Sequence, residues 1–456
     1  MPRPDGHTDT IAAVATAPGR GGIGIVRISG PEAQRIAVTL CGTLPRPRVA
    51  GFRVFAPSAG EVIDSGIVLH FPAPSSFTGE DVVELHGHGG PVVLQLLMQS
   101  ILSAGARLAR PGEFTERAFI NGKIDLAQAE AIADLIDSAS TEAARGASRS
   151  LQGEFSKLVT ALIEELTHLR VLVEACIDFP DEDIDFITDA HVDARMNALV
   201  ERLNHLHHQA RVGSMLRDGL TVVLAGKPNA GKSSLMNCLA GHDAAIVSAT
   251  PGTTRDVLRE QILIDGMPVH VIDTAGLRQS GDDVEREGIS RALREAGKAD
   301  LLLLVVDSSS ADSPLSIAKE HLSSLGESLP PLCIVLNKSD LSGLTAGECK
   351  ADGQIQIAVS ALTGAGLHAL RAHISRLVGF SAGESGAFSA RRRHLDAIGR
   401  ARNSLSEGLL SLNDHAAVEL LAEHLRDAQR ALGEITGQVT PDDLLGEIFS
   451  SFCIGK

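Results

Sequence analysis

The chain has 456 residues, of which 44% are hydrophobic and 21% charged, and its formal net charge at pH 7 is −16. This length predicts two to four domains, and the composition argues against large-scale disorder. No apolar run is long enough to span a bilayer and the first residues lack the apolar core of a secretion signal, so we expect a cytoplasmic protein without a membrane span. Six cysteines without CxxC spacing argue against a zinc site or a disulfide framework.

The first two regions differ in their apolar pattern. Residues 1–121 show short apolar runs separated by glycine and proline, which predicts an α+β domain. From Asp125 onward the pattern becomes alanine-rich with helical spacing, which predicts the first part of a helical domain over 122–215. His86 and His88 flank a glycine, and without a third ligand we interpret them as structural or surface residues.

A glycine-rich loop follows the apolar run at 220–225 and precedes a helical stretch. It reads Gly-Lys-Pro-Asn-Ala-Gly-Lys-Ser over 226–233. Such a loop turns backbone N–H groups toward an anion, and the following helix adds its positive end. Lys232 is expected to reach the terminal phosphates of a nucleotide and Ser233 to bind Mg²⁺, although a plain strand-to-helix turn is the alternative. The predicted contacts are Asn229, Ala230, Gly231, Lys232, Ser233 and Ser234.

A second motif, Asp273-Thr274-Ala275-Gly276, ends another mostly apolar segment. Its acidic residue can hold the metal through water, and its glycine amide can face the γ-phosphate. The all-apolar runs at 301–306 and 332–336 predict strands buried on both faces of a parallel sheet. These elements, in this order, predict a nucleotide-binding α/β domain over 216–379.

The second of those runs ends in Asn337-Lys338-Ser339-Asp340, which predicts selection of the base. Asp340 can accept hydrogen bonds from N1–H and the 2-amino group of guanine, which adenine cannot supply. The backbone at Ser360-Ala361 is placed to support guanine O6, although an ordinary loop fits those residues equally well. We therefore predict a GTPase that binds GTP and GDP.

The residue after Gly276 is Leu277, which cannot orient an attacking water. Asn229 and an oxygen-rich segment offer a replacement, because a K⁺ ion between the phosphates would supply positive charge while Thr254 completes the Mg²⁺ shell. An ordinary switch loop with no second ion fits equally well. Glu285 lies in an acidic cluster within reach of this region, but its spacing does not single it out. The segment comprises Ser248, Ala249, Thr250, Pro251, Gly252, Thr253 and Thr254.

Helical periodicity returns after residue 389, and Thr440-Pro441 predicts the start of a further helix. Residues 380–456 are thus predicted to complete the helical domain, with the GTPase domain inserted in one of its loops. Arg391–Arg393, with Arg400 and Arg402 about two to three helical turns on, form the best candidate patch for nucleic acid in this acidic chain, and a solvated helix face is equally compatible. Cys453 fits either a nucleophile or a small buried residue.

Several motifs carry a resemblance to a known family. They are the segments 17–30, 77–81, 84–91 and 111–119, together with the terminal Cys453-Ile454-Gly455-Lys456. In these segments the chain resembles the MnmE (TrmE) family of tRNA-modification GTPases. The resemblance implies a homodimer that forms a heterotetramer-type complex with an FAD-dependent partner, MnmG or GidA. Together they would add an aminomethyl or carboxymethylaminomethyl group to C5 of the wobble uridine (U34) of certain tRNAs, in a cycle driven by GTP hydrolysis.

The resemblance also implies roles for particular residues. It assigns K⁺ to Asn229, Ser248, Thr250 and Thr253, and it makes Glu285 the residue that orients water.

It further implies a 5-formyltetrahydrofolate site formed by Arg27, Glu84 and Lys123, with Lys456 nearby, and it makes Cys453 a candidate for chemistry at the uridine. Arg27 and Lys123 can pair with the glutamate tail of the folate, and Glu84 can accept hydrogen bonds from its aminopyrimidine. Because the chain has neither tyrosine nor tryptophan, a phenylalanine would have to stack on the pterin.

Two alternatives use the same GTPase motifs. A ribosome-assembly GTPase of the Era or Der type shares the switch sequence Thr253-Thr254-Arg255-Asp256, but the chain has no GXXG-bearing KH pattern and no second phosphate loop. A GTP-regulated scaffold without chemistry of its own also fits.

Overall fold

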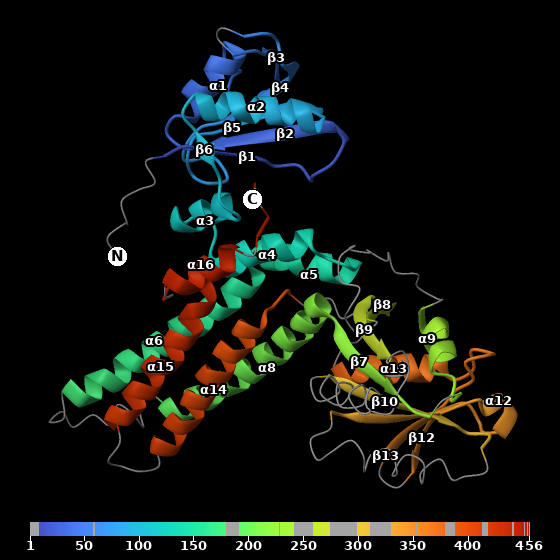
Figure 1. Ribbon diagram of the computed structural model, residues 1–456. Helices are drawn as coiled ribbons and strands as arrows, with labels where there is room; N and C mark the ends of the chain where they lie inside the picture. The colour runs from blue at the N-terminus through green and yellow to red at the C-terminus, as the bar shows by residue number, and fades with distance from the viewer. Residues whose placement is uncertain are drawn as a thin grey trace, which may run out of the picture. The chain divides into compact units, whose positions relative to one another are not determined.

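The computed structural model describes residues 9–57, 60–178, 191–227, 229–240, 259–273, 299–310, 330–351, 354–378, 388–412, 418–439, 442–450, 452–453 and 455. The chain divides into two compact units, whose elements Figure 1 labels. Unit 1 consists of residues 1–133, 150–193 and 403–456, and unit 2 consists of residues 134–149 and 194–402. Several helices contain residues of both units: α4 (Leu126–Ile136), α5 (Thr141–Leu151), α8 (Val192–Asp218) and α14 (Arg392–Leu412).

The described part of unit 1 contains a six-stranded sheet. Its strands are β1 (Ile11–Val14), β2 (Gly21–Ser29), β3 (Gly51–Phe55), β4 (Asp64–Phe71), β5 (Val82–Gly89) and β6 (Arg107–Leu108). They pair in the order β3-β4-β5-β2-β1-β6, antiparallel except for β1 and β6. This mostly antiparallel sheet with its helices confirms the predicted α+β class.

Helices α1 (Ala33–Cys41) and α2 (Pro91–Ser103) cover one face of this sheet (Figure 1). The buried residues of α2 recur at helical spacing: Leu94, Leu97, Met98 and Ile101. On β2, Val26 and Ile28 face this core. Since side chains alternate along a strand, Arg27 between them faces the other side of the sheet.

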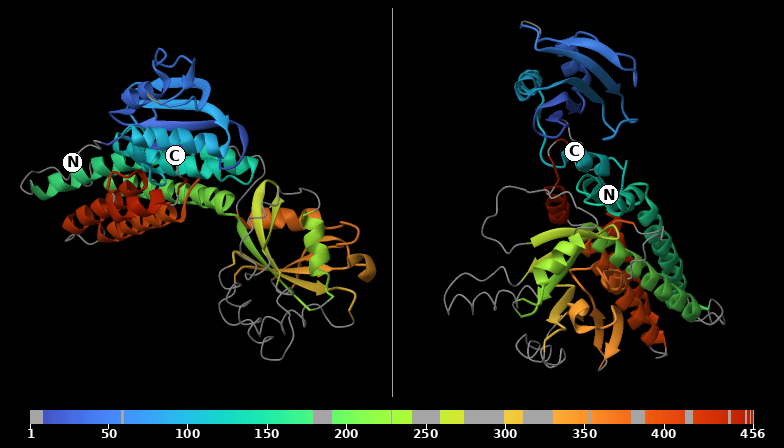
Figure 2. Two further views of the ribbon diagram at one scale, coloured as in Figure 1. Left: turned by 45° about the horizontal axis from the view of Figure 1, so that its top comes forward. Right: turned by 90° about the vertical axis from the view of Figure 1, so that its right-hand side faces the viewer.

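Helices α6 (Glu154–Asp178) and α15 (Val418–Thr436) lie along one another in unit 1 (Figure 2). Arg170 on α6 donates to Gln429 on α15 at 2.6 Å, and Gln429 donates to Thr167 at 3.0 Å. The last helix, α16 (Asp442–Ser450), begins directly after Thr440-Pro441, as predicted. It packs Phe449 against Phe119 of α3 (Glu113–Ile120), so the end of the chain folds together with its N-terminal region.

Unit 2 is built on a seven-stranded sheet in the order β12-β13-β11-β10-β7-β9-β8. Its strands are β7 (Leu220–Ala225), β8 (Arg259–Ile264), β9 (Met267–Asp273), β10 (Leu301–Asp307), β11 (Leu332–Asn337), β12 (Gly347–Ala351) and β13 (Gln354–Ala358). The five central strands are parallel, and β8 and β12 form antiparallel edges. The apolar runs of β10 and β11 are almost entirely buried, as their composition predicted.

Helices α9 (Lys232–Ala240) and α13 (Leu367–Val378) contribute Leu235 and Leu370 to the main core of this sheet. A short helix, α12 (Ser339–Ser342), follows β11. The predicted multidomain architecture is therefore confirmed: an α+β part, a helical part drawn from both sides of the insertion, and an inserted α/β sheet.

Candidate functional site

The carboxyl ends of the parallel strands in unit 2 share one edge of the sheet. The chain runs from β7 to β9 on one side of β7 and later to β10 on its other side. Such a reversal of strand order is where open α/β sheets bind ligands. The loop after β7 lies at this reversal.

That loop adopts the conformations that its glycines permit. Gly226 has φ +144°, and a Cβ there would stand 2.1 Å from the carbonyl oxygen of Val305 on β10. Gly231 has φ +89°, and a Cβ there would stand 2.2 Å from Nδ2 of Asn337. Asn229 also has a positive φ of 63° and is exposed. The backbone therefore approaches its neighbours more closely than side chains would allow.

Lys232 begins α9 and is 6% exposed. Its Nζ donates to the carbonyl oxygens of Gly226 and Lys227 at 2.8 and 3.0 Å, so the ammonium group lies inside the loop. Ser233 and Ser234 are exposed in the first turn of the same helix. A helix N-terminus with a central ammonium group can hold phosphate oxygens.

Asn337 joins this loop to a second one. Its Nδ2 donates to the carbonyl oxygen of Ala230 at 2.9 Å, and its Oδ1 accepts from the amide of Ala361 at 3.1 Å. The side chain is 2% exposed. Asn337 thus holds the glycine-rich loop and the Ser360-Ala361 loop together, two segments that sequence alone placed only by their order.

Lys338 adopts a left-handed conformation, with φ 64°, and its Nζ lies 2.5 Å from Oδ2 of Asp307 at the end of β10. Burial alone would raise the pKa of Asp307, but hydrogen bonds from Lys338 and Ser309 hold that pKa below its ordinary value. Asp340 is exposed at the same edge, on α12. Sequence reasoning missed Asp307, although its position directly after an apolar strand was the available signal.

Several predicted site residues lie outside the described residues: Ser248, Ala249, Thr250, Pro251, Gly252, Thr253, Thr254, Thr274, Ala275, Gly276, Glu285 and Lys456. Asp273 is described as the last residue of β9.

On the face of the unit 1 sheet opposite α1 and α2, adjacent strands carry a polar group. Nε of Arg27 donates to Oε1 of Glu84 at 2.9 Å, and Nε2 of His86 lies 3.0 Å from Oε2 of the same carboxylate. The Arg27 guanidinium lies over the Phe114 ring, 5.7 Å from its centroid. His86, interpreted from sequence as a structural or surface residue, is thus a direct partner of Glu84, as the alternation of residues 84 and 86 on one strand would allow.

Lys123 and Cys453 do not contact this group directly in the described contacts. Nζ of Lys123 donates to the carbonyl oxygen of Pro74 at 3.0 Å. Cys453 is exposed, and its carbonyl oxygen accepts from the amide of Gly112 at 3.3 Å. Two residues later, a Cβ on Gly455 would stand 2.4 Å from the carbonyl oxygen of Val14 on β1. The chain end therefore lies against the sheet that carries Arg27.

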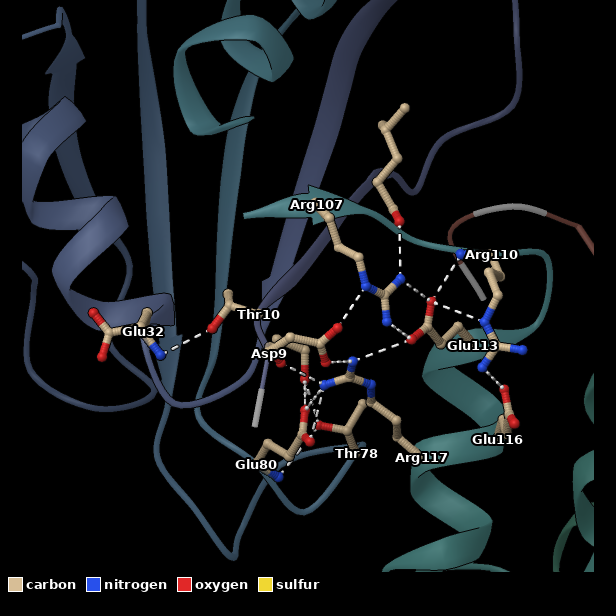
Figure 3. Close-up of polar contacts among 12 residues, drawn as sticks. Asp9, Thr10, Glu32, Thr78, Glu80, Arg107, Arg110, Glu113, Glu116 and Arg117 are labelled. Atoms are coloured by element: carbon tan, nitrogen blue, oxygen red, sulfur yellow. Dashed lines mark hydrogen bonds and ion pairs between the residues drawn. The ribbon is translucent and has the colours of Figure 1, made fainter. Parts of the chain in front are cut away.

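A buried ionic network stabilises the same region (Figure 3). Arg117 is fully buried and contacts Asp9, Glu80 and Glu113 at 2.8, 3.1 and 3.1 Å. Arg107 donates to both carboxylate oxygens of Glu113, at 2.5 and 2.8 Å. Burial would raise the pKa of Glu113, but these arginines and a backbone amide lower it to about 2. The motif residues Glu80, Glu113 and Arg117 are therefore internal ion-pair partners in a network that joins the segments before β1 and β5 to β6 and α3.

One member of the predicted basic patch at Arg391–Arg393, Arg391, needs a correction. Nη2 of Arg391 donates to the buried carboxylate of Asp134 at 2.8 Å. Its charge is compensated inside the protein, so Arg391 is not part of an open cationic surface. Within the described ranges, no helix combines the length and apolar composition needed to cross a membrane, and no three His, Cys, Asp or Glu side chains are grouped to hold a metal ion.

The strand order of unit 2, its glycine-rich loop at the reversal point and the bridging Asn337 define a P-loop GTPase. Family models match the chain as the MnmE helical domain over residues 126–453 and as the GTP-binding protein TrmE N-terminus over residues 10–123. The tRNA modification GTPase MnmE of Pseudomonas paraeruginosa is 58% identical over 98% of this chain and 99% of its own length. The chain therefore belongs to the MnmE family of tRNA modification GTPases.

A second curated relative supports the family assignment, whereas the similar solved structures do not bear on it. The MnmE protein of Marinobacter nauticus is 56% identical over 98% of this chain and 99% of its own length. Among solved structures, the G domain of the T. maritima FeoB iron transporter is 26% identical, with coverage of 35% of this chain and 98% of that chain. Its TM-score is 0.26, so this likeness carries no part of the assignment. Because the chain belongs to the MnmE family, the alternative of an Era- or Der-type ribosome-assembly GTPase is not supported.

Proposed function

We propose that this GTPase acts with the FAD-dependent partner MnmG to add an aminomethyl or carboxymethylaminomethyl group to C5 of the wobble uridine of certain tRNAs. The observation that supports this most is the similarity to MnmE relatives along nearly the full length of both chains. We further propose a cytoplasmic homodimer within a heterotetramer-type complex. Its domains would span 1–121, 122–215, 216–379 and 380–456, the second and fourth forming one helical domain.

The nucleotide would be held at the edge where β7, β10 and β11 end. Lys232 would exchange its two carbonyl contacts for oxygens of the β- and γ-phosphates, and Ser233 would bind Mg²⁺ with Thr254 and, through water, Asp273. Asp340 would accept the N1–H and 2-amino hydrogens of guanine. The remaining proposed contacts are Ala230, Gly231, Ser234, Ala249, Pro251, Gly252, Thr274, Ala275, Gly276, Asn337, Lys338, Ser360 and Ala361.

We propose a K⁺ site next to these phosphates, formed by Asn229, Ser248, Thr250 and Thr253. The fit is supported by Asn229, whose left-handed backbone and exposed side chain leave an amide oxygen at the rim of the loop. When bound, K⁺ supplies positive charge between the β- and γ-phosphates. Glu285 would orient the attacking water, a role that Leu277 cannot fill.

We propose that the Arg27–Glu84 group binds 5-formyltetrahydrofolate with Lys123 and Lys456. Arg27 and His86 each contact one oxygen of the Glu84 carboxylate, which fixes the orientation of the carboxylate plane. A carboxylate held in this way can accept the paired hydrogen bonds of an aminopyrimidine. Phe114 lies fully buried under the Arg27 guanidinium, so its ring supports Arg27 and does not offer a face to the pterin. Cys453, exposed and close to β1, would act on the uridine.

Two measurements test this function. GTP turnover by the full chain should be faster in KCl than in NaCl at equal ionic strength, and equal rates would remove the potassium mechanism. The modified wobble uridine should disappear from the tRNA of cells lacking this chain and return when it is restored. Unchanged nucleoside levels in the deficient cells would refute the tRNA substrate while leaving the GTPase assignment standing.

A further inference from the structure

A second polar cluster in unit 2 centres on Asp134, near the C-terminal end of α4. Nε of Arg217 and Nη2 of Arg391 each donate to Oδ1 of Asp134 at 2.8 Å. Oγ of Ser389 donates to Oδ2 at 2.6 Å. Asp134 is only 8% exposed. One buried carboxylate therefore joins three segments that are far apart in the sequence.

Two of these segments flank the nucleotide-binding sheet. Arg217 stands near the end of α8, three positions before β7 and its phosphate loop. Ser389 and Arg391 follow α13, the last helix of that sheet. The two segments are in close contact, since a Cβ on Gly213 of α8 would stand 1.9 Å from the carbonyl oxygen of Phe388. Asp134 thus ties together the points where the chain passes into and out of the GTPase sheet.

The third segment, residues 134–149, which we call the α4–α5 corner, also contacts the sheet itself. The amide of Ser389 donates to the carbonyl oxygen of Gly146 on α5 at 3.1 Å. A Cβ on Gly266 would stand 2.3 Å from Oε2 of Glu142. Gly266 forms the turn between β8 and β9, and β9 ends at Asp273, where the predicted metal-binding motif begins. The corner therefore contacts the hairpin that leads to the nucleotide.

A cavity of about 100 Å³ separates parts of this corner from α8. Its lining includes Asp137, Ala143, Leu216 and Phe388. This volume is large enough to hold water between the corner and α8. A buried ion pair adds little net stability over apolar packing of the same size, but it can specify one orientation. The contacts of Asp134 with Arg217, Ser389 and Arg391 thus help to define the position of this corner against α8.

We propose that Asp134 is a positioning residue that couples the nucleotide state of the GTPase sheet to helices α4 and α5. A movement of the β8–β9 hairpin displaces Glu142, and the α4–α5 corner follows because Asp134 anchors it to Arg217 and Ser389. Both α4 and α5 continue into residues of unit 1, the unit that contains Arg27, Glu84 and Cys453. On the proposed function, the corner is one covalent route, beside α8 and α14, from the GTPase sheet to the unit that carries the proposed uridine chemistry.

The test compares Asp134→Asn with Asp137→Asn, an exposed carboxylate that lines the same cavity. Amide hydrogen exchange of residues 126–151 is measured in the full chain with GDP and with a non-hydrolysable GTP analogue. In the wild type and in Asp137→Asn, exchange should differ between the two nucleotides. In Asp134→Asn this difference should shrink by about fivefold or more, while GTP turnover stays within about twofold of wild type. An undiminished difference in Asp134→Asn would overturn the proposal.

A milder variant covers the case in which Asp134→Asn does not fold. Ser389→Ala removes a single hydroxyl and leaves both arginines on the carboxylate. It should reduce the nucleotide-dependent difference in exchange while retaining cooperative melting. A purely structural role would instead change exchange equally in both nucleotide states, and that result in Ser389→Ala would also overturn the proposal.

Discussion

Asn337 shows at the residue scale how one side chain can determine a binding site. Replacing it by alanine leaves the carbonyl of Ala230 and the amide of Ala361 without their shared partner. The cost of such a loss is about 1–3 kcal/mol, so we expect Asn337→Ala to weaken GDP binding by about tenfold or more. Calorimetric titration with GDP measures this, with the exposed amide variant Gln354→Ala as control. Equal affinities for the two variants would contradict the bridging role.

Glu113 provides a second residue-scale prediction, on pH. Its pKa is about 2 in the folded protein, against 4.5 for an ordinary glutamate side chain. The contribution of its carboxylate to stability is therefore complete above pH 4.5 and is lost as the pH falls toward 2. Glu113→Gln removes the one fully buried carboxylate among the partners of Arg117 and should cost about 3–5 kcal/mol at neutral pH. Thermal unfolding should show the gap between variant and wild type narrowing as the pH falls from 4.5 toward 2.

The control for that measurement lies on the same helix. Glu116 pairs with Arg110, whose side chain is 58% exposed, and such surface pairs contribute about 0–1 kcal/mol. Glu116→Gln should therefore melt close to wild type at both pH values. A gap for Glu113→Gln that is constant with pH would show that its carboxylate is not the titrating group.

At the scale of elements, sequence reasoning succeeded where a single segment carries its own signal. The apolar runs of β10 and β11 and the Thr440-Pro441 helix start were readable because burial and capping act locally. The carboxylate partner of Arg391 was not, because that contact joins elements that only the tertiary fold brings together. Charge patterns in particular mislead, since a run of arginines looks the same whether it faces solvent or a buried carboxylate.

The phosphate loop yields a prediction at this scale as well. Gly226→Ala places a Cβ against the carbonyl of Val305 at a φ of +144°, so it should cost more than about 1 kcal/mol and disrupt the loop. Gly399→Ala is the matched control, because nothing lies within 4 Å of its Cβ and it stands inside α14. That change should raise the melting temperature slightly, as alanine favours helices. Nucleotide affinity, measured by titration, should fall only for Gly226→Ala, and its retention there would contradict the close approach.

At the scale of the whole molecule, the elements proposed for GTP hydrolysis and for uridine chemistry belong to different units of the chain. The phosphate loop lies in unit 2, and Cys453 lies in unit 1 with Arg27 and Glu84. A change confined to the thiol should therefore leave nucleotide turnover unaffected. The two activities become separable by mutation, although they are coupled in the working cycle.

Cys453→Ser tests this separation. Serine preserves the backbone contact of residue 453 with Gly112 and removes only the thiol, so folding and GTP turnover should remain within about twofold of wild type while the modified uridine is lost. Cys349→Ser is the matched control, an exposed cysteine on β12 of unit 2, and should preserve both activities. Both are measured by GTP turnover in vitro and nucleoside analysis of tRNA from complemented cells. Normal modified uridine with Cys453→Ser would mean that the thiol takes no part in the chemistry, whereas loss with both variants would point to a general sensitivity to cysteine replacement.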